Sequence, residues 1–439
     1  MILKKKSYFH LLGIFVLWSL YVPIALAQDP HIISLKKSTV PLHVYVQFES
    51  NPHREAVVSW TTTLPGKKHV LYYDTKPRHG KIDQYAYQSN NIHSGAYTLR
   101  SEEKPMASFY HHAYLNNLKP STRYYLTVES DGESLGEYYF ITAPSDDRTV
   151  SLLIGGDSRL GNDRVEETNA RRRMNTIMRG TLEKHNNIIA LAHTADYTQK
   201  AYWSQLYYWL KDHYEKTTTS DKRLLPIFPS RGNHDMDIGF EEMFWWPNRK
   251  NSYYYTANLN KNTSLVILNT EISINGDQRT WLENELKTLR PKKRWLGAMY
   301  HRPAYPSVRA YEDGESRRRA WVPLFEQYQI DLVSSGHDHS MKRTVPILNV
   351  APSAKGIVYI GDGGLGVRPR QVDKDRWYLK PPGIAKSVHN VHFVEYTTKQ
   401  INIRAFGING ETLDNFVIPA NRQARVAHYQ RLLNEAKNN

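Results

Sequence analysis

The sequence predicts an all-β sandwich followed by an α/β layered domain, and three observations support this fold class. Residues 38–145 contain short runs rich in Val, Tyr and Phe that turn-forming residues separate, which is typical of a sandwich. Between residues 149 and 419, strand-like runs alternate with helix-like runs, as in α/β layered folds. In this second part, five strand-like runs lead into Asp, Asn or His side chains.

The first 27 residues have the features of a secretory signal peptide. Lysines at positions 4–6 precede an apolar run that ends with Ala-Leu-Ala at positions 25–27, and this order is typical of a cleaved signal. The alternative interpretation is an uncleaved membrane anchor. We expect an exported protein, periplasmic or extracellular, with no membrane-spanning segment in the mature chain.

Composition limits the possible classes of function. Hydrophobic residues make up 40% of the 439 residues and charged residues 23%, as expected for a globular rather than a disordered protein. The chain contains no cysteine, so its stability must come from its core and not from disulfides. The formal net charge of +15 favours anionic partners. Because no nucleic-acid-binding module is recognisable, we expect a phosphorylated anionic substrate.

Two arginine triplets contribute to this charge, Arg171–Arg173 and Arg317–Arg319. Each triplet lies in a helix-like stretch. We interpret both as solvated helix faces, and an anion-binding surface is the alternative.

The predicted sandwich contains a recognisable corner. Residues 118–124, Leu-Lys-Pro-Ser-Thr-Arg-Tyr, resemble the late-strand corner of fibronectin type III domains. In that corner Tyr124 would anchor the turn through its hydroxyl group, which is a packing role. A polar linker at Pro144–Arg148 then separates the sandwich from the α/β domain.

Helical patterns in the α/β domain are clearest in two places. Residues 164–185 have helical spacing, with an N-terminal capping signal at Thr168 or Asn169. Residues 277–289 form an amphipathic pattern. The last segment, residues 420–439, is basic and polar and is expected to form a helical tail.

The five strand ends predict a metal site. In an open α/β sheet, ligand sites form where the loops leave the carboxyl ends of the strands. Carboxylate, amide and imidazole ligands suit Fe, Mn or Zn, and several of them at one edge can hold two cations for metal-assisted hydrolysis of a phosphoester. The residues that follow the five runs are Asp157, Asp196, Asn233 with His234, His301, and His337 with His339.

These motifs resemble a known family. The order Gly156-Asp157, Ala195-Asp196, Gly232-Asn233-His234-Asp235, His301 and Gly336-His337-x-His339 is similar to that of the calcineurin-like metallophosphoesterase superfamily. The closer resemblance is to purple acid phosphatases, which also have a fibronectin-like domain before the catalytic domain. The resemblance extends from about residue 40 to about residue 410.

The resemblance implies a role for each of these residues. Asp157 and His339 would bind the first metal, and Asp196 would bridge both metals. Asn233, His301 and His337 would complete the second metal site. A metal-activated hydroxide would attack phosphorus, and His234 would stabilise the transition state or protonate the leaving group.

Three arginines lie beside the motifs and are candidates to bind the phosphate of a substrate: Arg159, Arg302 and Arg343. A guanidinium group donates two parallel hydrogen bonds to an oxyanion, which suits this role. The alternative for each arginine is a structural salt bridge.

The sequence departs from the family pattern around the first metal. Arg159 stands where the wider superfamily has a histidine ligand, and Gln199 stands where purple acid phosphatases have a tyrosine ligand. Tyr197 is too close to Asp196 in sequence to replace that tyrosine, and Ala195 replaces a glycine. Either three protein ligands hold the first metal weakly, or the charge of Arg159 leaves only one cation bound.

Three hypotheses remain open from the sequence. The leading one is an exported metal-dependent phosphomonoesterase, similar to an acid phosphatase. A phosphodiesterase is the alternative among enzymes. A weakly catalytic or non-catalytic protein that binds anions in the cell envelope is the alternative from another class.

Overall fold

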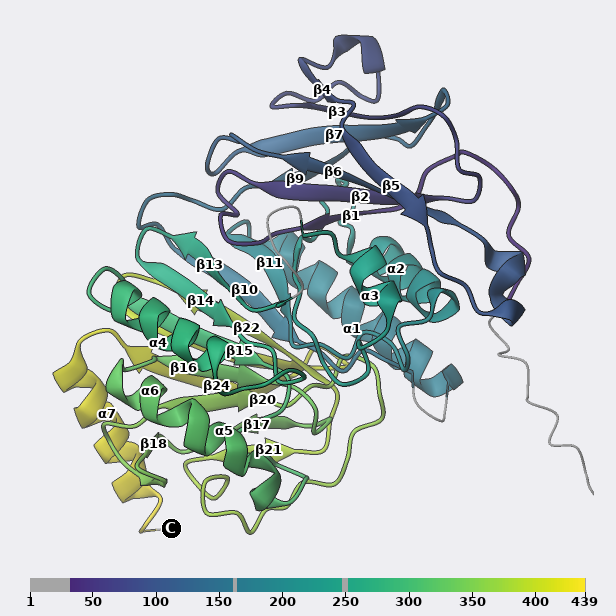
Figure 1. Cartoon of the computed structure of the whole chain (residues 1–439). Helices are drawn as coiled ribbons and strands as arrows, with labels where there is room; N and C mark the ends of the chain where they lie inside the picture. Colours follow the sequence, from purple (N-terminus) through teal and green to yellow (C-terminus); the bar gives the residue numbers. More distant parts are fainter. Residues whose placement is uncertain (1–31, 161–163, 247–251, 439) are drawn as a thin grey trace, which may run out of the picture.

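The computed structural model describes residues 32–160, 164–246 and 252–438. The predicted signal peptide, residues 1–27, lies outside the described residues. Figure 1 shows a β-sandwich packed against a larger domain of sheets and helices, so the predicted fold class is confirmed. None of the helices within the described ranges has the length and apolar character needed to cross a membrane.

The N-terminal sandwich is built from short strands in two sheets. Strands β1, β2, β6 and β5 form one layer, and β4, β3, β7, β8 and β9 form the other. The strands are β1 (Leu42–Gln47), β2 (Ala56–Thr62), β3 (His69–Asp74), β4 (Tyr87–Ser89), β5 (Ile92–Ala96), β6 (Phe109–Leu115), β7 (Arg123–Ser130), β8 (Glu133–Ser134) and β9 (Tyr138–Ile141).

The predicted tyrosine corner is present in this sandwich. Tyr124 is buried, and its hydroxyl oxygen accepts a hydrogen bond from the backbone N–H of Lys119 at 2.7 Å. The bond holds the turn before β7, which confirms the packing role predicted for Tyr124.

Two sheets pack face to face in the larger domain, and the first of them continues into the sandwich. The strand order is β24-β23-β22-β10-β11-β12 in the first sheet and β13-β14-β15-β16-β20-β17-β21 in the second. The strands of the first sheet are β10 (Val150–Gly155), β11 (Ile188–His193), β12 (Ile227–Phe228), β22 (Asn390–Tyr396), β23 (Gln400–Gly407) and β24 (Thr412–Pro419). Those of the second are β13 (Tyr255–Asn260), β14 (Thr263–Ile267), β15 (Trp295–Tyr300), β16 (Leu332–Ser335), β17 (Met341–Arg343), β20 (Val358–Gly361) and β21 (Ile384–Lys386), and a small hairpin is formed by β18 (Ile347–Leu348) and β19 (Ala351–Pro352).

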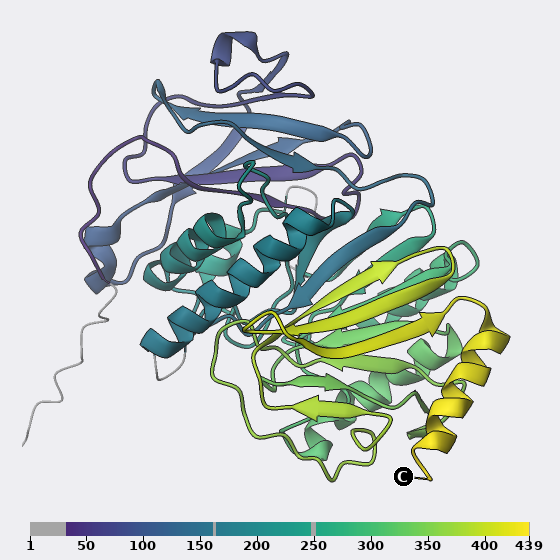
Figure 2. The ribbon, with the colours of Figure 1, turned by 180° about the vertical axis from the view of Figure 1, so that it is seen from behind.

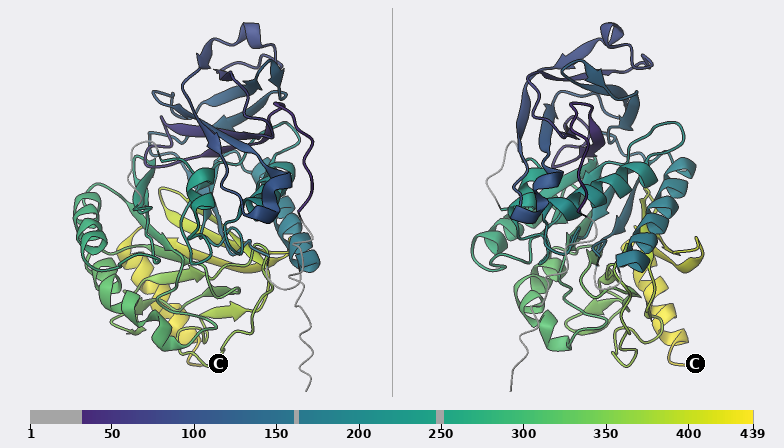
Figure 3. Two further views of the ribbon diagram at one scale, coloured as in Figure 1. Left: turned by 45° about the vertical axis from the view of Figure 1, so that its right-hand side comes forward. Right: turned by 90° about the vertical axis from the view of Figure 1, so that its right-hand side faces the viewer.

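Helices cover the outer faces of these two sheets, as the turned views show (Figure 2, Figure 3). Met174 and Met178 of the first helix pack on Leu153 of β10. On the opposite side, Leu282 of a later helix packs with Leu296 of β15. The helices are α1 (Arg164–Lys184), α2 (Trp203–Thr217), α3 (Ile238–Met243), α4 (Asp277–Leu289), α5 (Glu315–Ala320), α6 (Val322–Gln327) and α7 (Arg422–Glu435).

The sandwich and the larger domain share one sheet. Strand β12 pairs in parallel with β1, with Gln47 opposite Ile227, and the N–H of Phe48 donates to the carbonyl of Ile227 at 2.9 Å. One hydrophobic cluster includes Val58 of the sandwich and Val394 of β22. The linker at Pro144–Arg148 therefore does not separate two independent cores.

Helix α1 differs from the prediction in two respects. It begins at Arg164, so Thr168 and Asn169 lie inside the helix and do not cap it. Glu166 and Glu167 occupy its first turn, where carboxylates interact favourably with the positive end of the helix dipole.

The first arginine triplet is not a solvated face throughout. Arg171 is buried, and its Nε donates to Asp212 of α2 at 3.0 Å. Arg171 also donates to the carbonyl of Ser158 at 3.3 Å, next to the predicted metal ligand Asp157. The prediction of a solvated helix face is wrong for Arg171, because α2 packs over this side of α1 and supplies a carboxylate.

Candidate metal centre

Parallel strands bring the predicted ligands to one edge of the two sheets. Strands β10, β11 and β12 are parallel in one sheet, and β14, β15, β16 and β20 are parallel in the other. Their carboxyl ends carry the loops that contain Asp157, Asp196, His301 and His337. The arrangement follows the general position of ligand sites in such sheets.

The backbone turns sharply where these strands end. Asp157, Asp196 and His337 have φ angles of 53°, 57° and 81°, in the left-handed region that residues other than glycine rarely adopt. Such conformations persist where the surrounding structure enforces them, and they concentrate at functional sites. Here they turn the side chains back toward the edge of the sheets.

One group of predicted ligands converges closely. Single ligand atoms of Asp196, His301 and His337 lie within 4.8 Å of one another, and all three residues are buried. His301 Nε2 is 3.3 Å from Asp196 Oδ1, 3.2 Å from Asn233 Oδ1 and 3.1 Å from His337 Nδ1. The structure thus brings together the four residues predicted for the second metal.

The other nitrogen of His301 fixes the orientation of the ring. Nδ1 lies 2.9 Å from the carbonyl oxygen of Thr194, which only accepts, so Nδ1 carries a hydrogen. Nε2 then faces the oxygens of Asp196 and Asn233. A histidine ligand is oriented in this way when its second nitrogen donates to a carbonyl.

This group of atoms fits a bound cation. Burial is the largest single influence and lowers the pKa of His301, but the charge and hydrogen bond of Asp196, together with the charges of Asp157 and Glu271, outweigh it and raise the pKa to about 10. The position among these acceptors therefore strongly favours a positive charge, either a proton or a metal ion. Carboxylate, amide and imidazole donors suit Fe, Mn or Zn.

The residues predicted for the first metal form a second pair. His339 Nε2 lies 3.3 Å from Asp157 Oδ1. This buried oxygen has no hydrogen-bond partner among the described residues, which is unusual for a buried polar atom. The other oxygen of Asp157 accepts from the backbone N–H of His337 at 2.8 Å. The unpartnered oxygen is free to bind a cation.

A glycine outside the predicted ligand motifs makes room for Asp157. A Cβ atom at Gly363, which has a φ of 89°, would lie 2.0 Å from Asp157 Oδ2. Any larger residue at this position would displace the carboxylate. The sequence has glycines at positions 361, 363 and 364, but it does not indicate which side chain approaches them.

Arg159 lies beside Asp196. Its Nε is 3.8 Å from Asp196 Oδ2, and its guanidinium donates to the side-chain oxygen of Gln199. The two departures from the family pattern are therefore in contact. Tyr197 is buried and stacks on the ring of His193, with a centroid distance of 3.8 Å, so it fills the core.

His234 lies at the open side of the cluster. Its backbone N–H donates to Asp196 Oδ1 at 3.1 Å, and its Nδ1 is 2.8 Å from the carbonyl oxygen of Gln199. This bond leaves Nε2 directed toward the cluster, 3.8 Å from Asp196 Oδ2. Burial lowers the pKa of His234, so the neutral ring is favoured.

Asp235 is a positioning residue that the sequence analysis did not single out. Its buried carboxylate accepts from the backbone N–H groups of Asp196 at 2.7 Å, Tyr197 at 3.0 Å and Gly232 at 3.0 Å. Burial and the charge of Asp196 raise its pKa to about 8. Asp235 ties the loop after β11 to the loop after β12. Its place next to His234 was the available signal.

The three candidate arginines lie in different surroundings. Arg302 pairs with Glu271, with Nε 2.9 Å from Oε1, and its Nη1 is 3.5 Å from His337 Nε2. Arg343 is held by Asp414 at 2.7 Å and lies over the ring of Phe416. Arg159 and Arg302 thus adjoin the cluster, whereas Arg343 contacts β24 and donates to the carbonyl of Pro382 at 2.9 Å.

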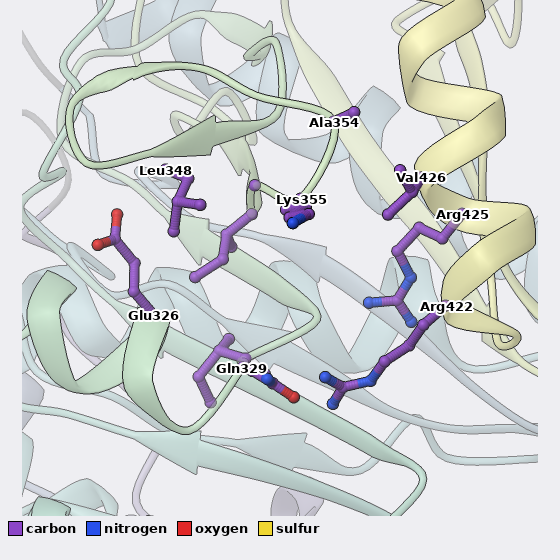
Figure 4. A pocket seen from close by; sticks show the side chains of 11 residues that line it. Glu326, Gln329, Leu348, Ala354, Lys355, Arg422, Arg425 and Val426 are labelled. Atoms are coloured by element: carbon purple, nitrogen blue, oxygen red, sulfur yellow. The ribbon is translucent and has the colours of Figure 1, made fainter.

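Cavity size alone does not mark this site. A cavity of about 300 Å³ lies between α6, the β18–β19 hairpin and α7, and Figure 4 shows Arg422 and Arg425 projecting toward it from α7. None of the predicted ligands lines it. A smaller cavity of about 180 Å³ adjoins the metal cluster and includes His337 in its wall.

Comparison with known families agrees with the two-part architecture. Residues 41–143 match the N-terminal domain of purple acid phosphatases. Residues 168–341 match the calcineurin-like phosphoesterase family. The second match includes Asp196, Asn233, His301, His337 and His339.

Individual relatives and solved structures support this result. A purple acid phosphatase of Glycine max is 25% identical over 363 residues, which cover 74% of this chain and 73% of that protein. A phosphoenolpyruvate phosphatase of Allium cepa is 26% identical over 369 residues, covering 75% and 71%. The structure of a purple acid phosphatase from Lupinus luteus covers 87% of this chain and 74% of its own, with a TM-score of 0.72 at 16% identity. The structure of PhoD covers 89% and 92%, with a TM-score of 0.63 at 10% identity.

These matches explain the order of domains and the shared arrangement of the sheets. The family implies a centre with two metals at the edge where the predicted ligands meet. The chain belongs to the purple acid phosphatase-like calcineurin-type metallophosphoesterases and is a hydrolase that acts on phosphoesters.

Proposed function

We propose that the protein is an exported metal-dependent phosphomonoesterase. The observation that carries the proposal is the buried Nε2 of His301, which faces Asp196, Asn233 and His337 within 3.3 Å. Cations bound there would lower the pKa of a water molecule and offset the charge that develops on the phosphoryl oxygens.

The residues around the cluster have distinct roles in this proposal. Asp157 and His339 would hold one metal on one side of Asp196. A second metal on its other side would be held by Asn233, His301 and His337. His234 holds its Nε2 toward the substrate, because its Nδ1 is engaged by the Gln199 carbonyl. From there it stabilises a phosphoryl oxygen or transfers a proton to the leaving group. In this proposal Arg302 and Arg159 contact the phosphate.

Export and cellular location are part of the proposal. The apolar run that ends with Ala-Leu-Ala at positions 25–27 supports a cleaved signal. The N-terminus of the mature protein, measured by mass spectrometry, would then follow Ala27. An intact leader in the exported protein would contradict this part.

The activity is tested by phosphate release from 4-nitrophenyl phosphate after loading with Fe, Mn or Zn. We expect turnover with at least one metal, and a loss of at least a hundredfold in His337→Ala, because the metal centre loses a ligand. His79→Ala is the control, since His79 is exposed on the sandwich. The proposal fails if no metal gives turnover, or if His337→Ala is as active as the unmodified protein. A parallel assay with bis(4-nitrophenyl) phosphate tests the phosphodiesterase alternative.

A further inference from the structure

The larger cavity, between α6, the β18–β19 hairpin and α7, is separate from the candidate metal centre. Ile330 and Ile357 line it and lie just before the first residues of β16 and β20. The loops that contain His337 and Gly363 leave the opposite ends of the same two strands. The cavity therefore lies at the other edge of the second sheet and does not extend the metal centre.

The size and walls of this cavity suit a small organic molecule. Its volume is about 300 Å³, which corresponds to roughly ten water molecules at ~30 Å³ each. This lies at the lower end of the range for small-molecule pockets, roughly 300–1,000 Å³. Apolar side chains from three elements form part of its walls, among them Ile330, Leu348 and Val426.

One side of the cavity is cationic. Three basic side chains line it, those of Lys355, Arg422 and Arg425. Among the described lining residues Glu326 is the one carboxylate, and its Oε1 already accepts from the backbone N–H of Asn349 at 2.9 Å. Figure 4 shows Arg422 and Arg425 on one side of the cavity and Glu326 on the other. The start of α7 therefore presents two guanidinium groups to the cavity.

The arginines at this side outnumber the carboxylates that could neutralise them. Buried Asp331 pairs with Arg290 at 3.2 Å and with Arg425 at 2.8 Å. Partial burial and the charges of Arg290 and Arg425 lower the pKa of Arg422, and the charge of Asp331 opposes this shift. Three positive charges around one negative charge leave an excess of two. A bound anion would offset that excess.

Both arginines of the cavity keep donors that a ligand can reach. Arg425 Nε donates to the carbonyl of Pro419 at 2.8 Å, and its Nη1 donates to Asp331 Oδ1 at 2.8 Å. These bonds fix the guanidinium plane. Its Nη2 is not among the buried polar atoms that lack a partner in the described structure, so it remains accessible. Arg422 is exposed at the first position of α7.

The helix end adds to the positive potential. Helix α7 begins at Arg422, and the side chain of Asn421 caps it by accepting from the N–H of Ala424 at 2.9 Å. Its first turn contains no acidic residue, although carboxylates are favoured and cations disfavoured at this end of the helix dipole. An anion in the cavity would supply the missing negative charge.

We propose that this cavity is a binding site for a small organic anion with an apolar body, with monocarboxylates as the main case. The apolar walls take up the body of the ligand, and Arg422 and Arg425 bind its carboxylate. Guanidinium groups suit this role because they donate paired hydrogen bonds to a carboxylate and keep their charge. The site does not depend on the phosphoesterase activity, since none of the predicted metal ligands lines the cavity.

Isothermal titration calorimetry on the full-length protein tests the class of ligand. 3-Phenylpropanoate is compared with 3-phenylpropanamide, which has the same apolar body without the charge, and with acetate, which has the charge without the body. We expect 3-phenylpropanoate to bind at least tenfold more tightly than either. Equal affinities for the acid and the amide would overturn the inference. Inorganic phosphate that binds as tightly as the acid would also overturn it, because the apolar walls would then contribute nothing.

Variants of α7 locate the binding. Arg422→Gln should weaken the binding of 3-phenylpropanoate at least tenfold, as expected when charge-assisted hydrogen bonds are lost. Val426→Phe should weaken it as much, because the larger side chain fills the cavity while both arginines remain. Arg431→Gln is the matched control on the same helix, since Arg431 is 66% exposed and pairs with Glu435. Equal affinities in Arg422→Gln and Arg431→Gln would overturn the inference.

A further comparison excludes binding at the metal centre, where a carboxylate could also bind. His337→Ala, and the unmodified protein after treatment with EDTA, should bind 3-phenylpropanoate as tightly as the untreated protein. Loss of binding in both samples would place the ligand at the metal centre and overturn the inference.

Discussion

Ala195 is a residue whose backbone conformation conflicts with its type. It lies directly before Asp196 with a φ of 78°, where a Cβ atom costs roughly 1–2 kcal/mol. Glycine avoids this cost but loses more conformational entropy on folding, about 0.4–1 kcal/mol. We therefore expect Ala195→Gly to raise the free energy of unfolding by about 0.5–1 kcal/mol. Urea unfolding measures this.

Ala192→Gly is the matched control for that substitution, since Ala192 lies in regular strand β11 and is not among the residues with positive φ. There the exchange should destabilise the protein. A loss of stability in both variants would show that the strain at Ala195 is already relieved by its surroundings.

We expect the charge of Arg159 to limit how many cations the centre holds. Its Nε is 3.8 Å from Asp196 Oδ2, so its charge opposes a metal on that side. We expect Arg159→His to raise the metal content from about one to about two ions per chain, because a ligand replaces a fixed cation. Inductively coupled plasma mass spectrometry of the purified protein gives the stoichiometry. Two ions in the unmodified protein would mean that Arg159 does not exclude the first metal.

At the residue scale, the sequence indicated the candidate ligands but not the contacts that position them. Asp157, Asp196 and His301 were recognisable because each follows an apolar run. The Thr194 carbonyl that orients His301, and Gly363 beside Asp157, depend on contacts between distant loops.

The packing of one helix on another depends on contacts that the periodicity of the sequence does not reveal. Helices α1 and α2 are an example. Asp212 of α2 binds buried Arg171 of α1 at 3.0 Å. Asp212 also pairs with Arg172, so removing Arg171 does not leave an unpaired charge; it removes charge-assisted hydrogen bonds, at a cost of about 1.5–3 kcal/mol. We expect Arg171→Ala to lower the free energy of unfolding by about this amount.

Arg173→Ala serves as the comparison for Arg171→Ala, because Arg173 is exposed and bonds Asn409. Its loss should change stability by less than about 0.5 kcal/mol. Chemical denaturation of both variants decides the matter. Equal effects would mean that the Arg171–Asp212 pair adds nothing to the packing of α1 on α2.

The existence of α1 and α4 was predicted from their spacing, and α4 begins at the predicted Asp277. The start of α1 was wrong because a capping residue was sought among Thr and Asn. The burial of Arg171 was missed because it depends on which helix packs alongside, and that is a property of the tertiary fold.

The whole molecule contains several histidines that are buried in the neutral state. Burial lowers the pKa of His43 and His112 to about 3, and that of His213 and His392 to about 4. In the unfolded chain a histidine binds its proton near pH 6.5. Below that pH the unfolded state therefore binds more protons than the folded state, and stability falls as the pH falls.

We expect the free energy of unfolding to decrease between pH 6.5 and pH 4, with each of these histidines contributing up to about 1.4 kcal/mol per pH unit. Urea unfolding at several pH values measures the slope. His392→Asn should make the slope shallower, whereas His79→Asn, at an exposed position, should not. A stability that is constant over this range would show that these side chains stay accessible to protons.

The pairing of β1 with β12 also determines where the chain can be divided. The linker at Pro144–Arg148 looks like a module boundary, but β12 has only two residues and hydrogen-bonds to β11 on one side and β1 on the other. A fragment without the sandwich would expose that short strand as an open edge, which favours aggregation. Chimeras that graft a foreign N-terminal module must therefore preserve the alignment of Gln47 with Ile227, and a matching linker alone will not be enough.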